Sequence, residues 1–465
     1  MRAKLPDLRQ DSRSPDEPSQ VGCSTTLPAP LGLISLVALV IANMIGIGVF
    51  TSSGYSLATL GSPGRVLLAW TVCGVWAVSG AICYGGLASR LPISGGEYLF
   101  LSRLVHPSLG FLAGWTSLFA GFTAPIALAA KGAAIHILTE RSSGDLLVSS
   151  LAAVLILLAT ACHLAGIRLG TRTQNSIVGA KILLLLGIIL VALISYGDGK
   201  WQGGSLPGRD ADWLPNDFAQ WWVLAGSMSW IALSYTGFNA AVYVAGESSE
   251  ARSNVPRAML VGTILVTLLY LALNFIFVFA PPTTDLVDSE GRGREAVAVI
   301  AASSIGGQTL ATVLTMTIVL AMISSVFAML MIGPRVYRQM SLDGVMPRMI
   351  GSSSFRPAII VQCLLSMVAV FLGDILQLMT YLGLTLSACS ALTVGSLWWI
   401  HHHRPESPPL ATIERIAIFA YLAISLSIIV AASQQRTEQF VAMLASFAAG
   451  IGLFILWRTW QASDR

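Results

Sequence analysis

Long apolar runs recur along almost the whole chain, and they constrain its fold more than any other feature of the sequence. Twelve runs of roughly 17 to 30 residues are present, and about 20 apolar residues in a helix suffice to cross a bilayer. They cover residues 31–60, 65–89, 107–138, 146–165, 174–196, 219–244, 257–280, 308–338, 357–373, 375–400, 412–432 and 440–459. Charged residues make up only 11% of the chain, whereas soluble proteins contain ~25%. The sequence therefore predicts an all-α polytopic membrane protein with twelve transmembrane helices.

Lysine and arginine are distributed unequally over the segments between these runs. With the N-terminus inside the cell, cytoplasmic segments hold 18 of the 27 basic residues and the opposite side holds seven. Because positively charged loops stay in the cytoplasm, we expect both termini there. Residues 1–28 are rich in Pro, Ser, Arg and Asp, and we expect them to form a disordered cytoplasmic tail. The formal net charge of +4 then reflects topology and needs no nucleic acid to explain it.

The first run, from about Leu31 to Leu60, is too long for one straight helix. At ~1.5 Å per residue it would span ~45 Å, while the bilayer core is ~30 Å thick. Gly46 and Gly48 mark a place where the helix can open, since each glycine costs ~1 kcal/mol relative to alanine inside a helix. An opened backbone in the membrane must be surrounded by protein or by a water-filled cavity. The other interpretation is that these glycines let a neighbouring helix approach closely.

Three motifs in order along the chain resemble one group of transporters. The first is Ile45-Gly46-Ile47-Gly48-Val49-Phe50. The second is the loop Pro92-Ile93-Ser94-Gly95-Gly96-Glu97-Tyr98, with Arg103 five residues after the tyrosine. The third is the apolar run from Trp230 to Asn239, interrupted at Gly237 and followed by Glu247 and by Pro256-Arg257-Ala258. This order resembles the amino acid-polyamine-organocation (APC) superfamily, and the third motif resembles its L-type amino acid transporter branch.

The resemblance implies a leucine-transporter-type fold, in which two groups of five helices are related as inverted repeats. The first repeat would occupy residues 29–200 and the second residues 217–400, with two additional C-terminal helices in residues 410–460. Interrupted helices at corresponding positions of the two halves mark the substrate site in such transporters. The first and sixth apolar runs of this chain would be those interrupted helices.

A break in the first helix would create groups that suit an α-amino acid. Helix N–H groups can receive a carboxylate, and carbonyls freed in both broken helices can receive an ammonium group. We expect Gly46, Ile47 and Gly48 to contact the carboxylate. Carbonyls would come from Ile41, Tyr235 and Thr236, and Phe238 would cover the ligand as an aromatic gate, although Tyr235 and Phe238 also fit as core aromatics. The full set of predicted substrate-binding residues is Ile41, Ile45, Gly46, Ile47, Gly48, Tyr235, Thr236, Gly237 and Phe238.

Lys181 lies ~10 Å inside the fifth run and has no acidic neighbour in the sequence. A lysine at this depth must snorkel to the interface, pair, or lose its proton. Its position resembles a lysine that takes the place of sodium in sodium-independent members of the superfamily. Ser324 and Ser325 in the eighth run, with a carbonyl near Asn43 or Met44, would complete this coupling site. We expect sodium-independent transport with Lys181 as a fixed or titrating cation, and its pKa would decide whether protons are carried.

The predicted cytoplasmic ends of the spans carry candidates for an inner gate. Glu97 would pair there with arginines such as Arg103 and Arg335, or Arg90 and Arg338, when the inner mouth is closed. A solvated interfacial glutamate is the alternative for Glu97. On the opposite side, residues 281–307 would form a lid, or else an ordinary solvated loop.

Several functional classes are excluded by what the sequence lacks. It shows no nucleotide-binding loop, metal-ligand spacing or nucleophile constellation, so we expect neither an enzyme nor a bound cofactor or metal. The central parts of the runs hold no Asp or Glu, which a polyamine or a cationic side chain would need as its partner. We therefore expect a secondary permease or exchanger that moves neutral L-amino acids by alternating access. A polyamine or cationic amino acid antiporter and a non-transporting amino acid sensor are the alternatives.

The expected partners are an amino acid substrate and the lipid bilayer of the plasma membrane, with protons as an open candidate. Of the six cysteines, Cys23 lies in the predicted tail and the other five lie within apolar runs, which indicates no disulfide framework. None of them marks the attachment of another chain, so no partner subunit is expected.

Overall fold

The computed structural model describes residues 31–138, 145–204, 206, 212–351, 354–372, 375–403, 408–435 and 437–463. Their regular structure is helical, apart from two isolated β-bridges. The helices are α1 Leu33–Met44, α2 Gly48–Leu60, α3 Pro63–Arg90, α4 Gly96–Leu104, α5 Pro107–Thr116, the π-helix η1 Ser117–Thr123, α6 Ala124–Ile137, α7 Asp145–Ala165, α8 Ile167–Gly197, α9 Phe218–Tyr235, the 3-10 helix η2 Ala240–Glu247, α10 Ala251–Phe279, the 3-10 helix η3 Thr283–Leu286, α11 Val297–Leu342, α12 Arg356–Leu372, α13 Ile375–His403, α14 Thr412–Gln435 and α15 Thr437–Ser463. The predicted tail, residues 1–28, lies outside the described residues.

Ten segments of the described chain are long and apolar enough to cross a membrane, which makes it a multi-pass membrane protein. One of these segments combines α1 with α2, and another combines α5, η1 and α6. Helix α12 is a shorter apolar helix, and α9 is not among the ten. The predicted count of twelve spans therefore stays a prediction.

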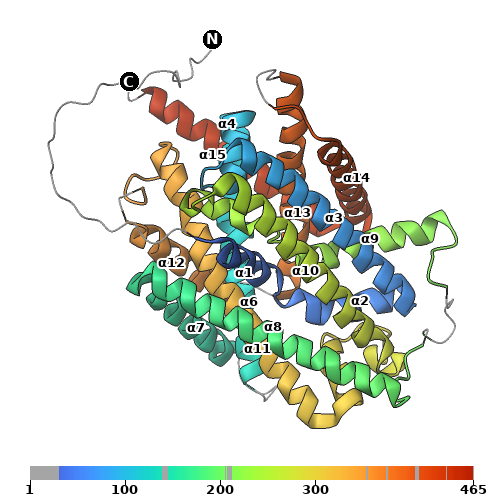
Figure 1. Cartoon of the computed structure of the whole chain (residues 1–465). Helices are drawn as coiled ribbons and strands as arrows, with labels where there is room; N and C mark the ends of the chain where they lie inside the picture. The colour runs from blue at the N-terminus through green and yellow to red at the C-terminus, as the bar shows by residue number, and fades with distance from the viewer. Residues whose placement is uncertain are drawn as a thin grey trace.

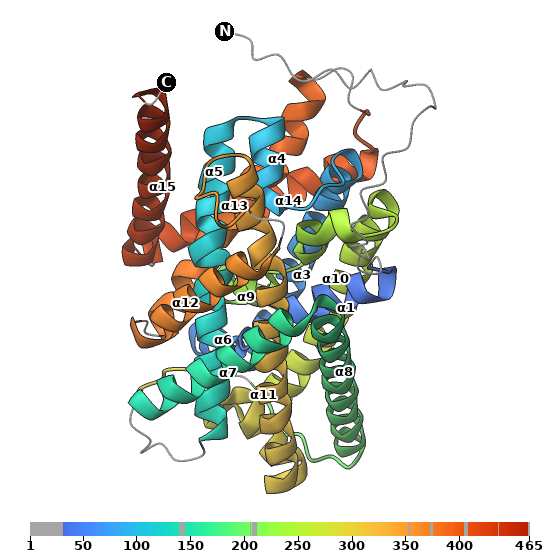
Figure 2. The same cartoon turned by 90° about the vertical axis from the view of Figure 1, so that its left-hand side faces the viewer.

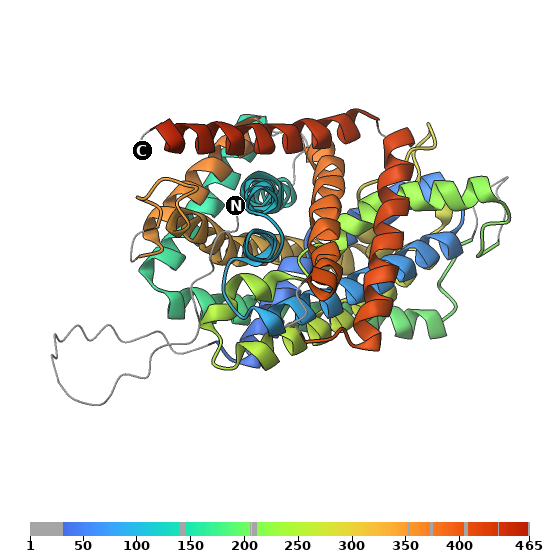
Figure 3. The same cartoon turned by 90° about the horizontal axis from the view of Figure 1, so that it is seen from above.

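The helices form one bundle (Figure 1), in which α1 packs against α8, α10 and α11. Helix α3 packs against α10, and α11 packs against α6, α7 and α8 (Figure 2). Helix α15 lies along the edge of the bundle (Figure 3), and only 17% of its apolar window is buried inside the protein. The first membrane segment is therefore surrounded by protein, while the last one is largely left to lipid.

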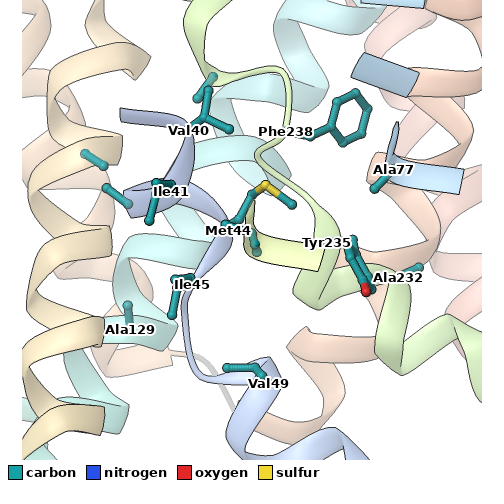
Figure 4. Packing of buried hydrophobic residues seen from close by; sticks show 14 of the residues in the cluster. Val40, Ile41, Met44, Ile45, Val49, Ala77, Ala129, Ala232, Tyr235 and Phe238 are labelled. Carbon is teal, nitrogen blue, oxygen red and sulfur yellow. The ribbon is translucent and has the colours of Figure 1, made fainter. Parts of the chain in front are cut away.

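The first membrane segment is broken at the two glycines, as predicted. Helix α1 ends at Met44 and α2 begins at Gly48, and between them Ile45 has φ −80° and ψ 88°, outside the helical region. Figure 4 shows the non-helical connection between Ile45 and Val49. Every residue from Leu39 to Ile45 is buried. Protein rather than lipid therefore meets the opened backbone, as the polarity of that backbone requires.

The helix that holds the third sequence motif is broken as well. Helix α9 ends at Tyr235, Thr236 is extended, and Gly237 has a φ of 96° before the chain resumes as η2. A Cβ at Gly237 would lie 2.9 Å from the carbonyl carbon of Asn43 in α1. Glycine is thus needed at position 237 both for its left-handed conformation and for close contact between the two breaks.

Two predicted boundaries differ from the structure. Helix α8 begins at Ile167 rather than near Gln174, and α11 begins at Val297 rather than near residue 308. The extra part of α11 precedes a kink at Gly306 and Gly307, where the φ of Gly307 is 64°. Apolar runs mark the part of a helix that lies in lipid, and they do not show a helix that continues past it.

The segment before α11 packs onto the membrane bundle. A Cβ at Gly54 of α2 would lie 2.1 Å from the carbonyl oxygen of Arg294, and the Tyr55 hydroxyl donates to a carboxylate oxygen of Glu295 at 2.6 Å. This part of the predicted outer loop is therefore seated on α2, which favours the lid over a freely solvated loop.

Candidate functional site

The two broken helices border a cavity of about 100 Å³. Room of this size holds several water molecules or a small solute. Its walls come from both breaks and from α3, α4, η1, α6, α11 and α13. The polar side chains that line it belong to Asn43, Glu97, Ser117, Ser234, Thr236, Asn239, Tyr243, Ser325 and Ser390.

The N-terminus of α2 opens into this cavity. Gly46, Ile47 and Gly48 line it, and no side chain of the described chain caps α2. Free N–H groups and the positive dipole end of a helix bind anions. A Cβ on Gly48 would lie 2.3 Å from the Oγ of Ser234, so the close approach of α9 beside the break depends on this glycine. The two interpretations of the glycines thus hold together.

Six of the nine predicted substrate-binding residues line the cavity. They are Gly46, Ile47, Gly48, Thr236, Gly237 and Phe238. The Phe238 ring makes edge-to-face contacts with Trp76 and Tyr84, at centroid distances of 6.0 and 5.4 Å. It is therefore held in place by α3 at one wall of the cavity.

Ile41, Ile45 and Tyr235 do not line the cavity. The carbonyl of Ile41 accepts a hydrogen bond from the Ile45 N–H at 3.1 Å, because the last turn of α1 is closed there. The Tyr235 hydroxyl donates to the Trp70 carbonyl at 3.1 Å, and its ring packs on Trp70 and Tyr270. Tyr235 therefore has the position of a core aromatic, which was the alternative for this residue.

The carbonyl of Ile45 belongs to the predicted coupling site. It accepts from the Lys181 Nζ at 3.4 Å and from the Ser325 Oγ at 3.2 Å. Lys181 is fully buried and also donates to the Ser324 Oγ at 3.2 Å. The structure thus brings Lys181, Ser324 and Ser325 together beside the α1 break.

The carbonyl of this site was expected near Asn43 or Met44, and the structure places it at the next residue, Ile45. The Met44 carbonyl itself accepts from the Tyr270 hydroxyl at 2.6 Å. The side chain of Ser325 reaches the carbonyls of Ala42 and Ile45. Because the chain leaves the helix after Met44, the Ile45 carbonyl can accept from both Lys181 of α8 and Ser325 of α11.

Glu97 is not placed as predicted. It is buried and lines the cavity. One carboxylate oxygen, Oε1, accepts from the Tyr84 hydroxyl, the Asn239 Nδ2 at 3.1 Å and the Ser390 Oγ at 2.8 Å, while the Cys389 Sγ lies 3.1 Å from Oε2. Within the described chain no arginine pairs with it, and it is not a solvated interfacial residue. Burial raises the pKa of Glu97, and the four hydrogen bonds only partly oppose that rise.

The glycine pair before Glu97 explains this placement. Gly95 and Gly96 have φ values of 140° and 58°, and a Cβ on Gly96 would lie 2.1 Å from the ring of Tyr243. The pair lets the turn press against η2 and begin α4 with Glu97 pointing inward. The inward position of Glu97 follows from these positive φ values, which only the structure shows. The sequence shows only that glycine stands at positions 95 and 96.

The predicted gate arginines have other acidic partners. Arg335 of α11 pairs with Glu247 at the end of η2, at 2.5 Å, and Arg103 of α4 pairs with Asp343 after α11, at 2.6 Å. These pairs join α11 to η2 and to α4 on the side of the cavity where Glu97 lies. The inner-gate prediction assigned Glu97 as the partner of both arginines, whereas the structure gives them Glu247 and Asp343.

Several cavity residues were not predicted. Asn43, Ser234, Asn239 and Ser390 are isolated polar residues inside apolar runs, and Trp76 is a tryptophan of α3 that stacks on Tyr421 at a centroid distance of 5.0 Å. Polar residues at such depth are the available signal. Their number in the sequence is large, however, and only the fold shows which of them face the cavity.

Comparison with known proteins agrees with this geometry. The family model for amino acid permeases matches residues 31–458. The chain is 25% identical to the large neutral amino acids transporter small subunit 2 of Rattus norvegicus, over 98% of this chain and 86% of the relative. It is 29% identical to the b(0,+)-type amino acid transporter 1 of Oryctolagus cuniculus, over 61% and 57%, and 25% identical to the human Asc-type amino acid transporter 1, over 85% and 76%.

These matches cover both helix breaks and nearly the whole described bundle. The matched proteins are transporters rather than enzymes, in line with the chemistry that the sequence lacks. With a family model matched over residues 31–458, the chain belongs to the amino acid permease family of the APC superfamily.

Proposed function

We propose that this protein is a secondary transporter that moves neutral L-amino acids across the membrane by alternating access. The observation that carries the proposal is the cavity between the two helix breaks, into which the uncapped N-terminus of α2 opens. That end suits the α-carboxylate, and the Thr236–Asn239 connection offers carbonyls to the α-ammonium group. Gly46, Ile47 and Gly48 would hold the carboxylate, with Phe238 as the gate.

The walls of the cavity favour a neutral side chain. Phe122, Leu128, Leu382 and Leu386 contribute apolar surface. Glu97 is the acidic residue among its lining side chains, but its oxygens already accept four hydrogen bonds. A carboxylate has about four lone-pair sites, so the four donors leave little room on this group for a cationic side chain. This supports a neutral amino acid over a polyamine or a cationic amino acid.

Sodium independence is supported by the site beside the α1 break. Lys181 places its ammonium group between the Ile45 carbonyl of α1 and the Ser324 hydroxyl of α11. A sodium ion bound at this point would use the same kinds of oxygen ligand. We propose that Lys181 replaces that ion and ties the broken helix to α8 and α11.

The proposal includes the predicted architecture and topology. The paired breaks support twelve spans that include two inverted repeats of five. The repeats would lie in residues 29–200 and 217–400, and two further helices in residues 410–460. The excess of basic residues on one side supports cytoplasmic termini, and the plasma membrane is part of the proposal. The name of the rat relative describes a small subunit. It therefore gives no support to the expectation that this chain has no partner subunit.

Counterflow in proteoliposomes tests the function. Purified protein is reconstituted with unlabelled leucine inside and labelled leucine outside, in buffer without sodium, and a panel of neutral, cationic and polyamine competitors follows. We expect saturable exchange that neutral amino acids inhibit. Saturable binding without exchange would instead identify a sensor, and inhibition by polyamines or cationic amino acids alone would identify the antiporter.

A further inference from the structure

Glu97 is a buried carboxyl group at the cavity that faces only neutral partners in the described part of the chain. Its exposed fraction is 3%. The titratable side chains that interact with it are Tyr84 of α3, Tyr243 of η2, Cys389 of α13 and Tyr421 of α14, which are phenols and a thiol. A buried carboxylate that serves only structure is usually met by a cation. Among the described residues, its four hydrogen-bond partners include no cation.

The nearest ion pairs on this side of the bundle are complete without Glu97. Arg90 pairs with Glu414 at 2.7 Å, Arg335 pairs with Glu247, and Arg103 pairs with Asp343. Each of these arginines therefore has an acidic partner other than Glu97. The positive charge that could balance Glu97 in this conformation is a proton.

The hydrogen-bond network can accommodate Glu97 with or without that proton. When Glu97 is ionised, all four partners donate to it. Tyr84, Ser390 and Cys389 carry groups that can also accept, whereas the Asn239 Nδ2 can only donate. When Oε2 carries a proton, it can donate to the Cys389 Sγ while Asn239 continues to donate to Oε1. Both protonation states therefore leave the group with hydrogen-bond partners.

Glu97 also joins the parts that must separate if the cavity opens on this side. Through its partners it connects α4 to α3, to the Thr236–Asn239 connection and to α13. Opening a path between these elements would bring water to the carboxyl group. A hydrated glutamate has a pKa near its ordinary value of ~4.3.

We propose that Glu97 is a proton-binding site of the transport cycle, which holds a proton while the cavity is closed toward α4 and releases it to water when that side opens. The proposal rests on the transport function proposed above. In the closed state the proton is bound to Oε2, and opening transfers it to water on the predicted cytoplasmic side. No other bond forms or breaks.

The sign of the pH effect follows from the direction of the pKa shift. Burial raises the pKa of Glu97 in the closed state relative to the open, hydrated state. The closed state therefore binds the proton more tightly and is favoured at low pH. Between the ordinary and the raised pKa, the ratio of closed to open states falls by about tenfold for each unit of pH increase.

Infrared difference titration of the purified protein tests proton binding without any need for transport. In the wild type we expect the C=O band of a protonated carboxyl group to persist to a higher pH than that of a hydrated glutamate, whose pKa is ~4.3. The band should be absent in Glu97→Gln and unchanged in the control Asp343→Asn, which removes an ion-paired carboxylate near the same side. A band of equal size in Glu97→Gln, or a wild-type band that is lost at the same pH as that of a hydrated glutamate, would overturn the proposal.

A second variant keeps the test valid if Glu97→Gln does not fold. Ser390→Ala removes one donor to the ionised carboxylate, so the band should persist to a pH higher by about one to two units. A midpoint that does not move, or moves to lower pH, contradicts the proposal. Both infrared results stand even if no amino acid is transported, so failure of this proposal and failure of the transport function are distinguishable.

Discussion

Lys181 and Glu97 are both buried ionisable residues beside the broken helices, but their surroundings differ. Lys181 lies outside the cavity and donates to a backbone carbonyl of the α1 break. Glu97 lines the cavity and accepts from side chains of several elements. A carbonyl can only accept, whereas hydroxyl and thiol partners can reverse their roles. The lysine site is thus built to hold one helix break in place, and the glutamate site is built to tolerate a change of charge.

The largest effect should follow from removing Lys181. Lys181→Ala deletes the donor to the Ile45 carbonyl and to Ser324, and hydrogen bonds from charged groups contribute ~1.5–3 kcal/mol each. We expect leucine exchange in proteoliposomes to fall by about tenfold to a hundredfold. Lys200→Ala is the matched control, because its partner Asp198 is half exposed. Full exchange by Lys181→Ala would show that the break does not depend on the lysine.

The next effect concerns the two glycines of the break. A Cβ at Gly48 would overlap Ser234, while a Cβ at Gly46 would make ordinary contact with Ser325. Overpacking costs ~1–3 kcal/mol. Gly48→Ala should therefore raise the leucine concentration needed for half-saturation about tenfold or more, and Gly46→Ala should raise it clearly less. Gly187→Ala in α8, where a Cβ meets open space, is the control. Equal effects of Gly46→Ala and Gly48→Ala would contradict the proposed close packing.

A smaller effect is expected from Ser325. Ser325→Ala removes its hydrogen bonds to the carbonyls of Ala42 and Ile45 but leaves Lys181 in place. A neutral hydrogen bond contributes ~1 kcal/mol net, so exchange should fall only about fivefold. The initial rate of exchange at saturating leucine measures this fall. A loss as large as that of Lys181→Ala would mean that the serine, and not the lysine, holds the break.

Removing the ion pairs between α11 and its neighbours should act on stability, which is measured separately from exchange. Arg335 is 6% exposed and its partner Glu247 is 22% exposed, whereas Arg103 is 52% exposed. Arg335→Gln should therefore lower the thermal unfolding midpoint measurably, because removing one partner of a largely buried pair costs a few kcal/mol. Arg103→Gln should change stability by less than ~1 kcal/mol. The reverse order would show that burial does not set the strength of these pairs.

Much of the helical plan could be predicted from the sequence, because apolar runs and glycine breaks are local properties. The break at Gly46 and Gly48, the break at Gly237 and the grouping of Lys181 with Ser324 and Ser325 are all observed. Exact helix ends were less predictable, as α11 shows, since a helix can continue beyond the lipid.

The positions of polar side chains around the cavity could not be predicted in the same way. Glu97 was expected among arginines because both follow the ends of apolar runs. Its actual direction depends on the two positive φ values of Gly95 and Gly96 and on contact with Tyr243 from a distant part of the chain. The sequence likewise does not show that the Ile41 carbonyl closes the last turn of α1 while the Ile45 carbonyl accepts from Lys181. Such directions are properties of the tertiary fold.

The most direct test of the account is the initial rate of leucine exchange in sodium-free proteoliposomes, measured against pH for the wild type and for Glu97→Gln. The account predicts exchange without sodium in both proteins, since Lys181 is unchanged. It also predicts a strong dependence on pH in the wild type that is largely lost in Glu97→Gln. A strict requirement for sodium in the wild type, or the same pH dependence in both proteins, would contradict it.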